Sequence, residues 1–264
     1  MTRPCPFIWY DLVTTDVDAA TRFYAAVAGL SYSKGGAPDK PYHHAYADGV
    51  GVGGCVALMP ETLARGAKPL WTGYIYVADV DAAITAMVAD GASVMMPRFD
   101  VPGEGAIALL ADPWGAPIHV MTPDGTGESQ AFQPQPAPGH MGWNELATPE
   151  PEAAIAFYGK HFGWAFPEPI DMGPMGKYHF LSFSADGVAP AGAIYRQPPD
   201  MPRSLWTYYI WADDIDAAMT RTTENGGTIV HGPHQVPGGQ FIFLGIDPQA
   251  AHFAMVGPRA GAPA

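Results

Sequence analysis

A repeat of about half the chain length constrains this sequence more than any other feature. The segment Leu-Trp-Thr-Gly-Tyr-Ile at residues 70–75 returns as Leu-Trp-Thr-Tyr-Tyr-Ile at residues 205–210. Other short matches keep the same order in both halves, among them Phe23-Tyr24 with Phe157-Tyr158, Tyr42-His43 with Tyr178-His179, and Asp112-Pro113 with Asp247-Pro248. A period this long indicates two homologous modules and excludes a solenoid of short repeats.

The bulk composition favours a globular protein. The 264 residues are enough for two domains of about 130 residues each. Hydrophobic residues make up 48% of the chain and charged residues 15%, which excludes a disordered chain. The formal net charge of -13 repels phosphate backbones, so we expect no nucleic-acid partner.

The cysteines and the N-terminal segment indicate a cytoplasmic protein. Cys5 and Cys55 are the only cysteines, and the second module has no counterpart to either, which is typical of reduced thiols. The N-terminal segment reaches Asp11 before the apolar core of a signal peptide could form. No stretch approaches the roughly 20 apolar residues of a membrane helix, so we expect no membrane partner.

Each module repeats one order of predicted elements. It opens with a strand, at residues 7–13 and 141–147, followed by a helix that ends at a glycine, Gly29 or Gly163. Three strands follow, and the pattern of strand, helix and three strands then occurs a second time within the module. The predicted fold is therefore α+β, with two tandem modules of paired β-α-β-β-β units. Each module would form a curved, cup-like sheet with helices on its outer face.

The predicted boundaries follow from the repeat and from local composition. The segment between the modules is rich in Pro, Gly, Gln and Ser and lacks periodicity, which indicates a linker. We predict a first module at 1–121, a linker at 122–139, a second module at 140–257 and a tail at 258–264.

Two motifs connect the chain to a known family. Each module opens with Asp/Glu-x-x-x-Ala-x-x-Phe-Tyr-x-x-x-x-Gly, and the first closes with Asp-Pro-x-Gly-x-x-Ile-x-Val. These motifs resemble the vicinal oxygen chelate superfamily, which contains glyoxalase I, extradiol dioxygenases, and bleomycin and fosfomycin resistance proteins. The two-module length, the Trp-x-Asp/Glu-Leu openings at 9–12 and 143–146, and Val-Met-Met-Pro at 94–97 are similar to a two-module, glyoxalase-like subgroup.

The resemblance implies a metal site inside the cup. Its ligands would come from the first, third and last strands, at positions that this chain fills with Trp9, Thr72 and His119, and with Trp143, Thr207 and Ala254. A catalytic metal needs about three N or O ligands, and only His119 qualifies. We therefore expect no metal cofactor. In the alternative, a displaced divalent metal would use a set drawn from Asp11, His43, Glu145, His179, His119 and His252.

Aromatic side chains are expected where the metal ligands are lost. Alternation along the strands places five of them on the inner face of a cup: Trp9, Trp143, Tyr74, Tyr209 and Trp211. An apolar concave surface with a few polar groups is typical of a small-molecule site. In the alternative, the same rings fill the cup as core.

Acids and histidines are the candidate polar groups of such a pocket. Asp11 and Glu145 occupy equivalent strand positions, where burial would fit them for general base catalysis; the alternative is a structural acid with satisfied hydrogen bonds. His119 is the single histidine at a former ligand position and the leading candidate for chemistry. His43 and His179 are predicted ligand contacts, or else structural partners of the preceding tyrosines.

These observations leave three functions open. The first is a glyoxalase-like protein without the usual metal that binds a small apolar or aromatic molecule and catalyses a lyase, isomerase or hydroxylase-type step. The second is a sequestering protein of the bleomycin-resistance kind, which binds without catalysis. The third is a metal-dependent glyoxalase or extradiol dioxygenase with displaced ligands. The sequence does not decide whether the chain is an enzyme or whether it is a monomer or a homodimer.

Overall fold

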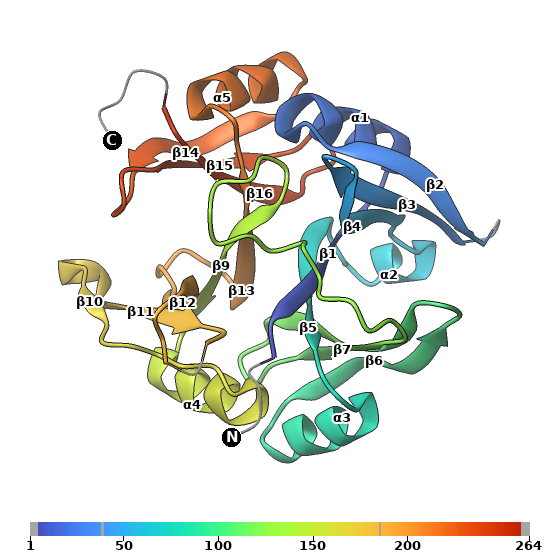
Figure 1. The fold of residues 1–264 in the computed structure, drawn as a ribbon, viewed down its shortest axis with the longest axis vertical. Helices are drawn as coiled ribbons and strands as arrows, with labels where there is room; N and C mark the ends of the chain where they lie inside the picture. The colour runs from blue at the N-terminus through green and yellow to red at the C-terminus, as the bar shows by residue number, and fades with distance from the viewer. Residues whose placement is uncertain (1–4, 38–39, 185, 260–264) are drawn as a thin grey trace. The chain divides into compact units, whose positions relative to one another are not determined.

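The computed structural model describes residues 5–37, 40–184 and 186–259. Within these residues the chain forms two eight-stranded sheets with few helices (Figure 1). The strands of the first sheet are β1 (Phe7–Thr14), β2 (Ser31–Ala37), β3 (Lys40–Ala47), β4 (Val50–Ala57), β5 (Leu70–Tyr76), β6 (Ser93–Val101), β7 (Gly105–Ala111) and β8 (Pro117–Pro123). The helices of this half are α1 (Val17–Ala28), α2 (Pro60–Ala64) and α3 (Val80–Ala89).

The second half repeats these elements. Its strands are β9 (Met141–Thr148), β10 (Ile170–Asp171), β11 (Lys177–Ser182), β12 (Pro190–Arg196), β13 (Leu205–Trp211), β14 (Thr228–Gln235), β15 (Phe241–Ile246) and β16 (His252–Gly257). Its helices are α4 (Pro151–Phe162), the short 3-10 turn η1 (Gly173–Met175) and α5 (Ile215–Glu224).

Both sheets have the same strand order. It is β2-β3-β4-β1-β5-β8-β7-β6 in the first and β10-β11-β12-β9-β13-β16-β15-β14 in the second. In the first sheet β1 is parallel to β4 and β5 is parallel to β8, while strands joined by hairpins are antiparallel. The predicted α+β fold of two duplicated modules is thereby confirmed.

Aspartates cap the start of three helices, and the two predicted glycines end α1 and α4. Asp16, Asp79 and Asp214 each accept a hydrogen bond from the backbone N–H three residues later, at 2.9 to 3.0 Å, so they cap α1, α3 and α5. Gly29 and Gly163 end α1 and α4 with φ of 71° and 67°, a left-handed conformation that glycine adopts without a side-chain clash.

Contacts divide the described chain into two compact units, each built from parts of both halves. Unit 1 contains the described residues of 1–8, 73–128 and 144–207. Unit 2 contains those of 9–72, 129–143 and 208–264. Each unit therefore holds half of each module.

In unit 2, a buried tyrosine on α1 joins the first module to the closing turn of the second. Trp71 Nε1 donates to the Tyr24 hydroxyl at 3.0 Å, and this hydroxyl donates to Asp247 Oδ2 at 3.1 Å. The other oxygen of Asp247 accepts from the backbone N–H groups of Gln249 and Ala251. Burial raises the pKa of Asp247 above its ordinary value. The Phe-Tyr motif of the first helix thus serves to hold a tight turn.

Unit 1 contains the same arrangement with the modules exchanged. Trp206 Nε1 donates to the Tyr158 hydroxyl, which donates to Asp112 Oδ2, both at 3.0 Å. The other oxygen of Asp112 accepts from the N–H groups of Trp114 and Ala116. Burial likewise raises the pKa of Asp112. The repeated motif therefore acts identically in both units.

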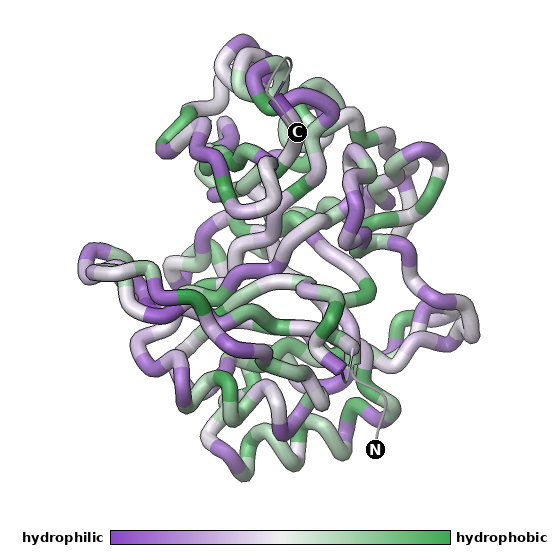
Figure 2. Tube along the Cα trace, turned by 60° about the vertical axis from the view of Figure 1, so that its left-hand side comes forward, coloured by the Kyte–Doolittle hydropathy of each residue, from purple (hydrophilic) through white to green (hydrophobic). Residues whose placement is uncertain are grey.

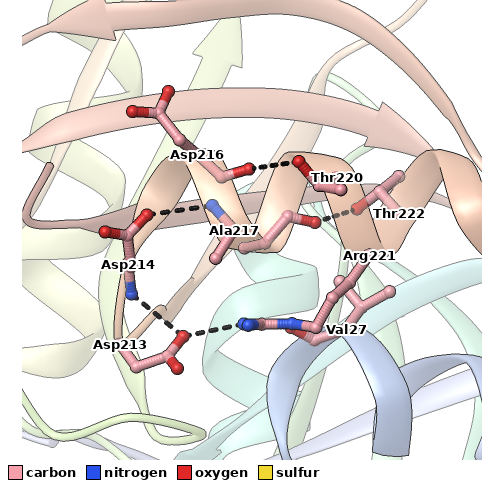
Figure 3. A network of polar contacts seen from close by, with 9 residues as sticks. Val27, Asp213, Asp214, Asp216, Ala217, Thr220, Arg221 and Thr222 are labelled. Carbon is pink, nitrogen blue, oxygen red and sulfur yellow. Dashed lines mark hydrogen bonds and ion pairs between the residues drawn. The ribbon is translucent and has the colours of Figure 1, made fainter. Parts of the chain in front are cut away.

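Helices α1 and α5 of unit 2 are joined by a single arginine (Figure 3). The Arg221 guanidinium donates to the Val27 carbonyl near the end of α1 and to Asp213 Oδ1, the latter at 2.7 Å. A cation at the end of a helix also interacts favourably with the helix dipole. The contact links two helices that are distant in sequence.

The segment predicted as a linker is partly packed within unit 2. Ala131 is fully buried, and His140 Nδ1 lies 2.7 Å from the Gln130 carbonyl oxygen. The backbone N–H of Gln133 donates to the Met141 carbonyl. Burial and hydrogen bonds therefore fix part of this irregular segment within unit 2.

Hydrophobic residues are interspersed with hydrophilic ones along the trace (Figure 2). None of the described helices is both long enough and apolar enough to cross a membrane.

Candidate functional site

A hydrogen-bonded line of three side chains lies on one face of β1 and β3. Trp9 and Asp11 share a face of β1 because side chains alternate along a strand. Trp9 Nε1 donates to the Tyr42 hydroxyl at 2.7 Å, and this hydroxyl donates to Asp11 Oδ1 at 2.6 Å. Asp11 is buried, whereas Trp9 and Tyr42 are half-buried. The line places a carboxylate beneath a partly exposed aromatic surface.

A glycine on the neighbouring strand makes this line possible. Gly54 lies opposite Asp11 in the parallel pairing of β4 with β1. A Cβ atom at Gly54 would lie 2.0 Å from the Tyr42 hydroxyl, far inside contact distance. Only glycine leaves room for the phenol ring to cross β4 and reach the carboxylate.

Two further rings extend the aromatic surface. The His44 ring packs edge-on against Tyr42 at 4.8 Å between centroids, and the Tyr46 ring lies 6.5 Å from His44. Both side chains are half-buried. We call Trp9, Asp11, Tyr42, His44 and Tyr46 the Trp9 cluster; all five belong to unit 2.

The structure brings His44, and not His43, beside Tyr42. His43 is 7% exposed and alternates onto the opposite face with the buried Ala45 and Ala47. The repeated Tyr-His pair favours His43 and His179 as candidates. Strict period-two counting from Tyr42 would have indicated His44 instead.

The second module carries a matching pair in unit 1. The Tyr178 hydroxyl donates to Glu145 Oε1 at 2.6 Å. The rings of Phe180 and Tyr195 lie 5.5 and 5.9 Å from Tyr178. Burial first, and the Glu145 charge second, raise the pKa of the Tyr195 phenol. Both predicted acids therefore accept a hydrogen bond from the tyrosine at the same repeat position.

His119 lies in unit 1 against a ring that was predicted to share its site. Its imidazole stacks on Tyr74 with centroids 4.1 Å apart and planes 5° apart. His119 and Tyr74 are paired in the parallel register of β8 with β5. Burial lowers the pKa of His119 to about 3, so the ring is neutral at physiological pH.

The remaining predicted aromatics form a hydrophobic cluster in unit 2. Tyr209 and Trp211 are buried around Ala254, and Trp143 packs against them half-buried. Trp211 Nε1 donates to the Gln133 carbonyl of the inter-module segment at 2.9 Å. Trp211 is therefore covered by this segment.

Comparison with known proteins assigns the family. A sequence model of the Glyoxalase/Bleomycin resistance protein/Dioxygenase superfamily matches residues 7–120 and 138–251. The chain belongs to this superfamily. Members bind small molecules, and the predicted resemblance to the vicinal oxygen chelate proteins is confirmed.

Several relatives of the superfamily align along nearly the whole chain. "Putative glyoxylase CFP32" of Mycobacterium tuberculosis is 32% identical over 254 residues, covering 95% of this chain and 94% of that protein. "Anthracycline biosynthesis protein DnrV" of Streptomyces peucetius is 29% identical over 293 residues, covering 100% of this chain and 98% of that protein.

Solved structures of the superfamily share the fold. The Mn(II)-bound glyoxalase from Novosphingobium aromaticivorans has a TM-score of 0.63 at 18% identity, covering 97% of this chain and 82% of that one. The 2,3-dioxygenase LapB from Pseudomonas sp. KL28 has a TM-score of 0.62 at 14% identity, covering 97% and 92%.

Most residues at the ligand positions that the superfamily implies are not metal donors. Of the expected ligand positions, Trp9 donates its indole N–H to Tyr42, and Ala254 lies within an apolar cluster. In the described part of the chain, no three His, Cys, Asp or Glu side chains form a group able to hold a metal ion. Of the alternative displaced set, His43 and His179 lie on the opposite strand face from Asp11 and Glu145.

Proposed function

We propose that this chain binds a small aromatic or apolar molecule on the Trp9 cluster and that it does so without a metal at the superfamily's ligand positions. The observation that carries the proposal is the line from Trp9 through Tyr42 to Asp11. It combines a half-buried aromatic surface with one buried, hydrogen-bonded acid, which is the usual composition of a small-molecule site. Rings of the ligand would stack on Trp9 and His44.

The same line can transfer a proton. A carboxylate that accepts from a tyrosine makes the phenol oxygen more electron-rich and can act as a general base through it. The Tyr42 oxygen would take a proton from the ligand while the Tyr42 hydroxyl proton moves to Asp11. The reverse transfer would restore both groups. This chemistry serves a lyase or isomerase step, the enzymatic form of the proposal.

The relatives support an aromatic ligand. One of them, DnrV, is named for anthracycline biosynthesis. Anthracyclines contain fused aromatic rings. A surface of stacked rings with one acid suits such a molecule better than a small aliphatic dicarbonyl.

Calorimetric titration with 1-naphthol tests the binding proposal. We expect saturable binding that Trp9→Ala weakens by up to about tenfold, because aromatic contacts of this kind contribute about 0.5–1.5 kcal/mol. Trp114→Ala, on the closing turn of β7 and β8 in unit 1, is the matched control and should leave the affinity unchanged. Absence of saturable binding, or equal losses in both variants, would refute the proposal.

Deuterium exchange separates catalysis from sequestration. In D2O, a bound ligand that gives up a carbon-bound proton to the Tyr42–Asp11 pair exchanges it for deuterium, observable by mass spectrometry. Asp11→Asn should abolish this exchange while retaining the ligand. Exchange at the same rate in Asp11→Asn would assign the proton transfer elsewhere, and binding without exchange across a panel of phenols and ketones would favour a sequestering protein.

A further inference from the structure

We infer that unit 1 carries a second binding site, a groove on the helix side of β11 that takes a hydrophobic monoamine. The groove has a volume of about 400 Å³ and lies beside α4. We call it the α4 groove; its polar lining is Glu152, Glu168, Lys177 and His179, and its apolar lining includes Ile155 and Phe166. It is separate from Tyr178 and Glu145, because His179 and Tyr178 point to opposite faces of β11.

Two prolines shape the groove by shortening the strand at the edge of the sheet. In the first module, β2 pairs with β3 along its whole length, and Lys34 lies opposite His43. At the equivalent place, the second module has Pro167 and Pro169, which lack the N–H groups that a strand ladder needs. Only the two residues of β10 pair with β11 there. The edge of the sheet beside His179 is thus left uncovered by a paired strand.

The outer wall of the groove is nevertheless well fixed. Ala165 and Ser182 exchange two backbone hydrogen bonds of 3.1 and 2.8 Å, which tie the segment to β11 just before the prolines. The Phe166 ring lies against Gly159 of α4, where a Cβ atom would be 3.7 Å away. The prolines restrict the backbone of the next residues. The wall is therefore formed before any ligand arrives, which lowers the entropic cost of binding.

His179 supplies the polar group at the base of the groove. The residue is 9% exposed, and its Nε2 atom is buried without a hydrogen-bond partner among the described residues. The nearest carboxylate oxygen, Glu152 Oε1, is 4.0 Å away. A buried polar atom left unpaired costs about 1–3 kcal/mol, so a ligand that donates a hydrogen bond to it gains that amount.

The charges of the lining select the class of ligand. Desolvation lowers the pKa of His179, so its ring is neutral and can accept a hydrogen bond at Nε2. The lining carries the carboxylates of Glu152 and Glu168 and the ammonium group of Lys177, which together leave one net negative charge. An organic ammonium group matches both features, since it donates a hydrogen bond to His179 and pairs with a carboxylate. Its hydrocarbon part would lie on Ile155 and Phe166.

Titration of the full chain with phenethylamine tests this site. The titration is monitored through the NMR signals of the histidine ring nitrogens. We expect a saturable shift of the His179 signal. We expect 2-phenylethanol and 3-phenylpropionate to bind at least about tenfold more weakly, because they lack the ammonium group. Equal affinity for the phenylpropionate anion, or no saturable shift of His179, would overturn the inference.

Substitutions locate the site. His179→Gln should weaken phenethylamine binding by about tenfold, whereas His43→Gln, at the equivalent buried position of the first module, should leave it within about twofold. Glu152→Gln, on the exposed start of α4, tests the ion pair in a variant that retains the fold. An unchanged affinity in Glu152→Gln, or equal losses in the two histidine variants, would contradict the assignment. Tyr42→Phe should not alter the affinity for phenethylamine, which distinguishes this site from the Trp9 cluster.

Discussion

Single residues decide the character of the candidate site. Strand alternation alone places Trp9 and Asp11 on one face, because the period of two follows from backbone geometry. The tyrosine that joins them comes from β3, and its reach depends on the missing side chain of Gly54. Such cross-strand contacts depend on register, which the sequence of one strand does not contain. His44 needs no register, because it lies two residues from Tyr42 on the same strand and alternation alone places the two rings on one face.

Gly54→Ala tests the steric argument. The added methyl group would overlap the Tyr42 hydroxyl, so the ring must leave Asp11. We expect a loss of about 1–3 kcal/mol in the free energy of unfolding and loss of ligand binding at the Trp9 cluster. Gly125→Ala, where a Cβ atom would meet nothing within 4 Å, is the matched control for urea denaturation. A variant as stable as this control would show that Tyr42 does not need the space.

The buried His119 predicts a pH dependence of stability. Its pKa is about 3 in the folded protein, against an ordinary value of 6.5. Between these values the unfolded chain binds a proton that the folded chain excludes, so the free energy of unfolding decreases as the pH falls below 6.5. The slope is at most about 1.4 kcal/mol per pH unit, and the effect is absent above pH 6.5.

His119→Phe should remove this part of the dependence while keeping a ring against Tyr74. Urea denaturation at pH 7 and pH 5 measures the change in the free energy of unfolding. His252→Phe, at an exposed position, is the control. Wild-type protein and His252→Phe should lose more stability than His119→Phe between the two pH values. Equal losses in all three would show that His119 takes up a proton in the folded state.

At the level of elements, the repeated motifs have structural roles that their sequence alone did not reveal. The Phe-Tyr pairs of α1 and α4 were recognised as family markers, and the structure shows their tyrosines bonded to the Asp of a closing turn. Those partners are distant along the chain, so no local pattern predicts them. Conversely, Pro167 and Pro169 lie in the sequence as visible strand breakers, and the shortened β10 follows from them directly.

Tyr24→Phe measures the contribution of one such contact. The substitution removes the hydroxyl that bridges Trp71 and Asp247, both of them buried. Leaving these partners unsatisfied should cost about 1–3 kcal/mol in urea denaturation. Tyr46→Phe, which loses only an exposed bond from Ser33, should change stability by less than about 0.5 kcal/mol. A Tyr24→Phe variant as stable as this control would mean that water replaces the lost hydroxyl.

For the whole molecule, the repeat was the most informative feature. It predicted two modules with the same elements, because the strands of each sheet follow one another along the chain. It could not predict that each compact unit combines half of each module, since that depends on contacts between residues far apart in sequence. The family resemblance places the expected metal-ligand positions at residues that include Trp9 and Ala254, and the structure shows other contacts for both. Trp9 becomes a hydrogen-bond donor to Tyr42, and Ala254 becomes part of an apolar cluster.

The central claim is that ligand binding belongs to the Trp9 cluster and needs no metal at the superfamily's usual positions. Calorimetric titration of EDTA-treated protein with 1-naphthol, with and without added Mn²⁺, tests it most directly. We predict the same affinity in both conditions, a loss of up to about tenfold in Trp9→Ala, and no change in His119→Ala. Binding that appears only with Mn²⁺ and disappears in His119→Ala would contradict the claim and assign the site to a metal.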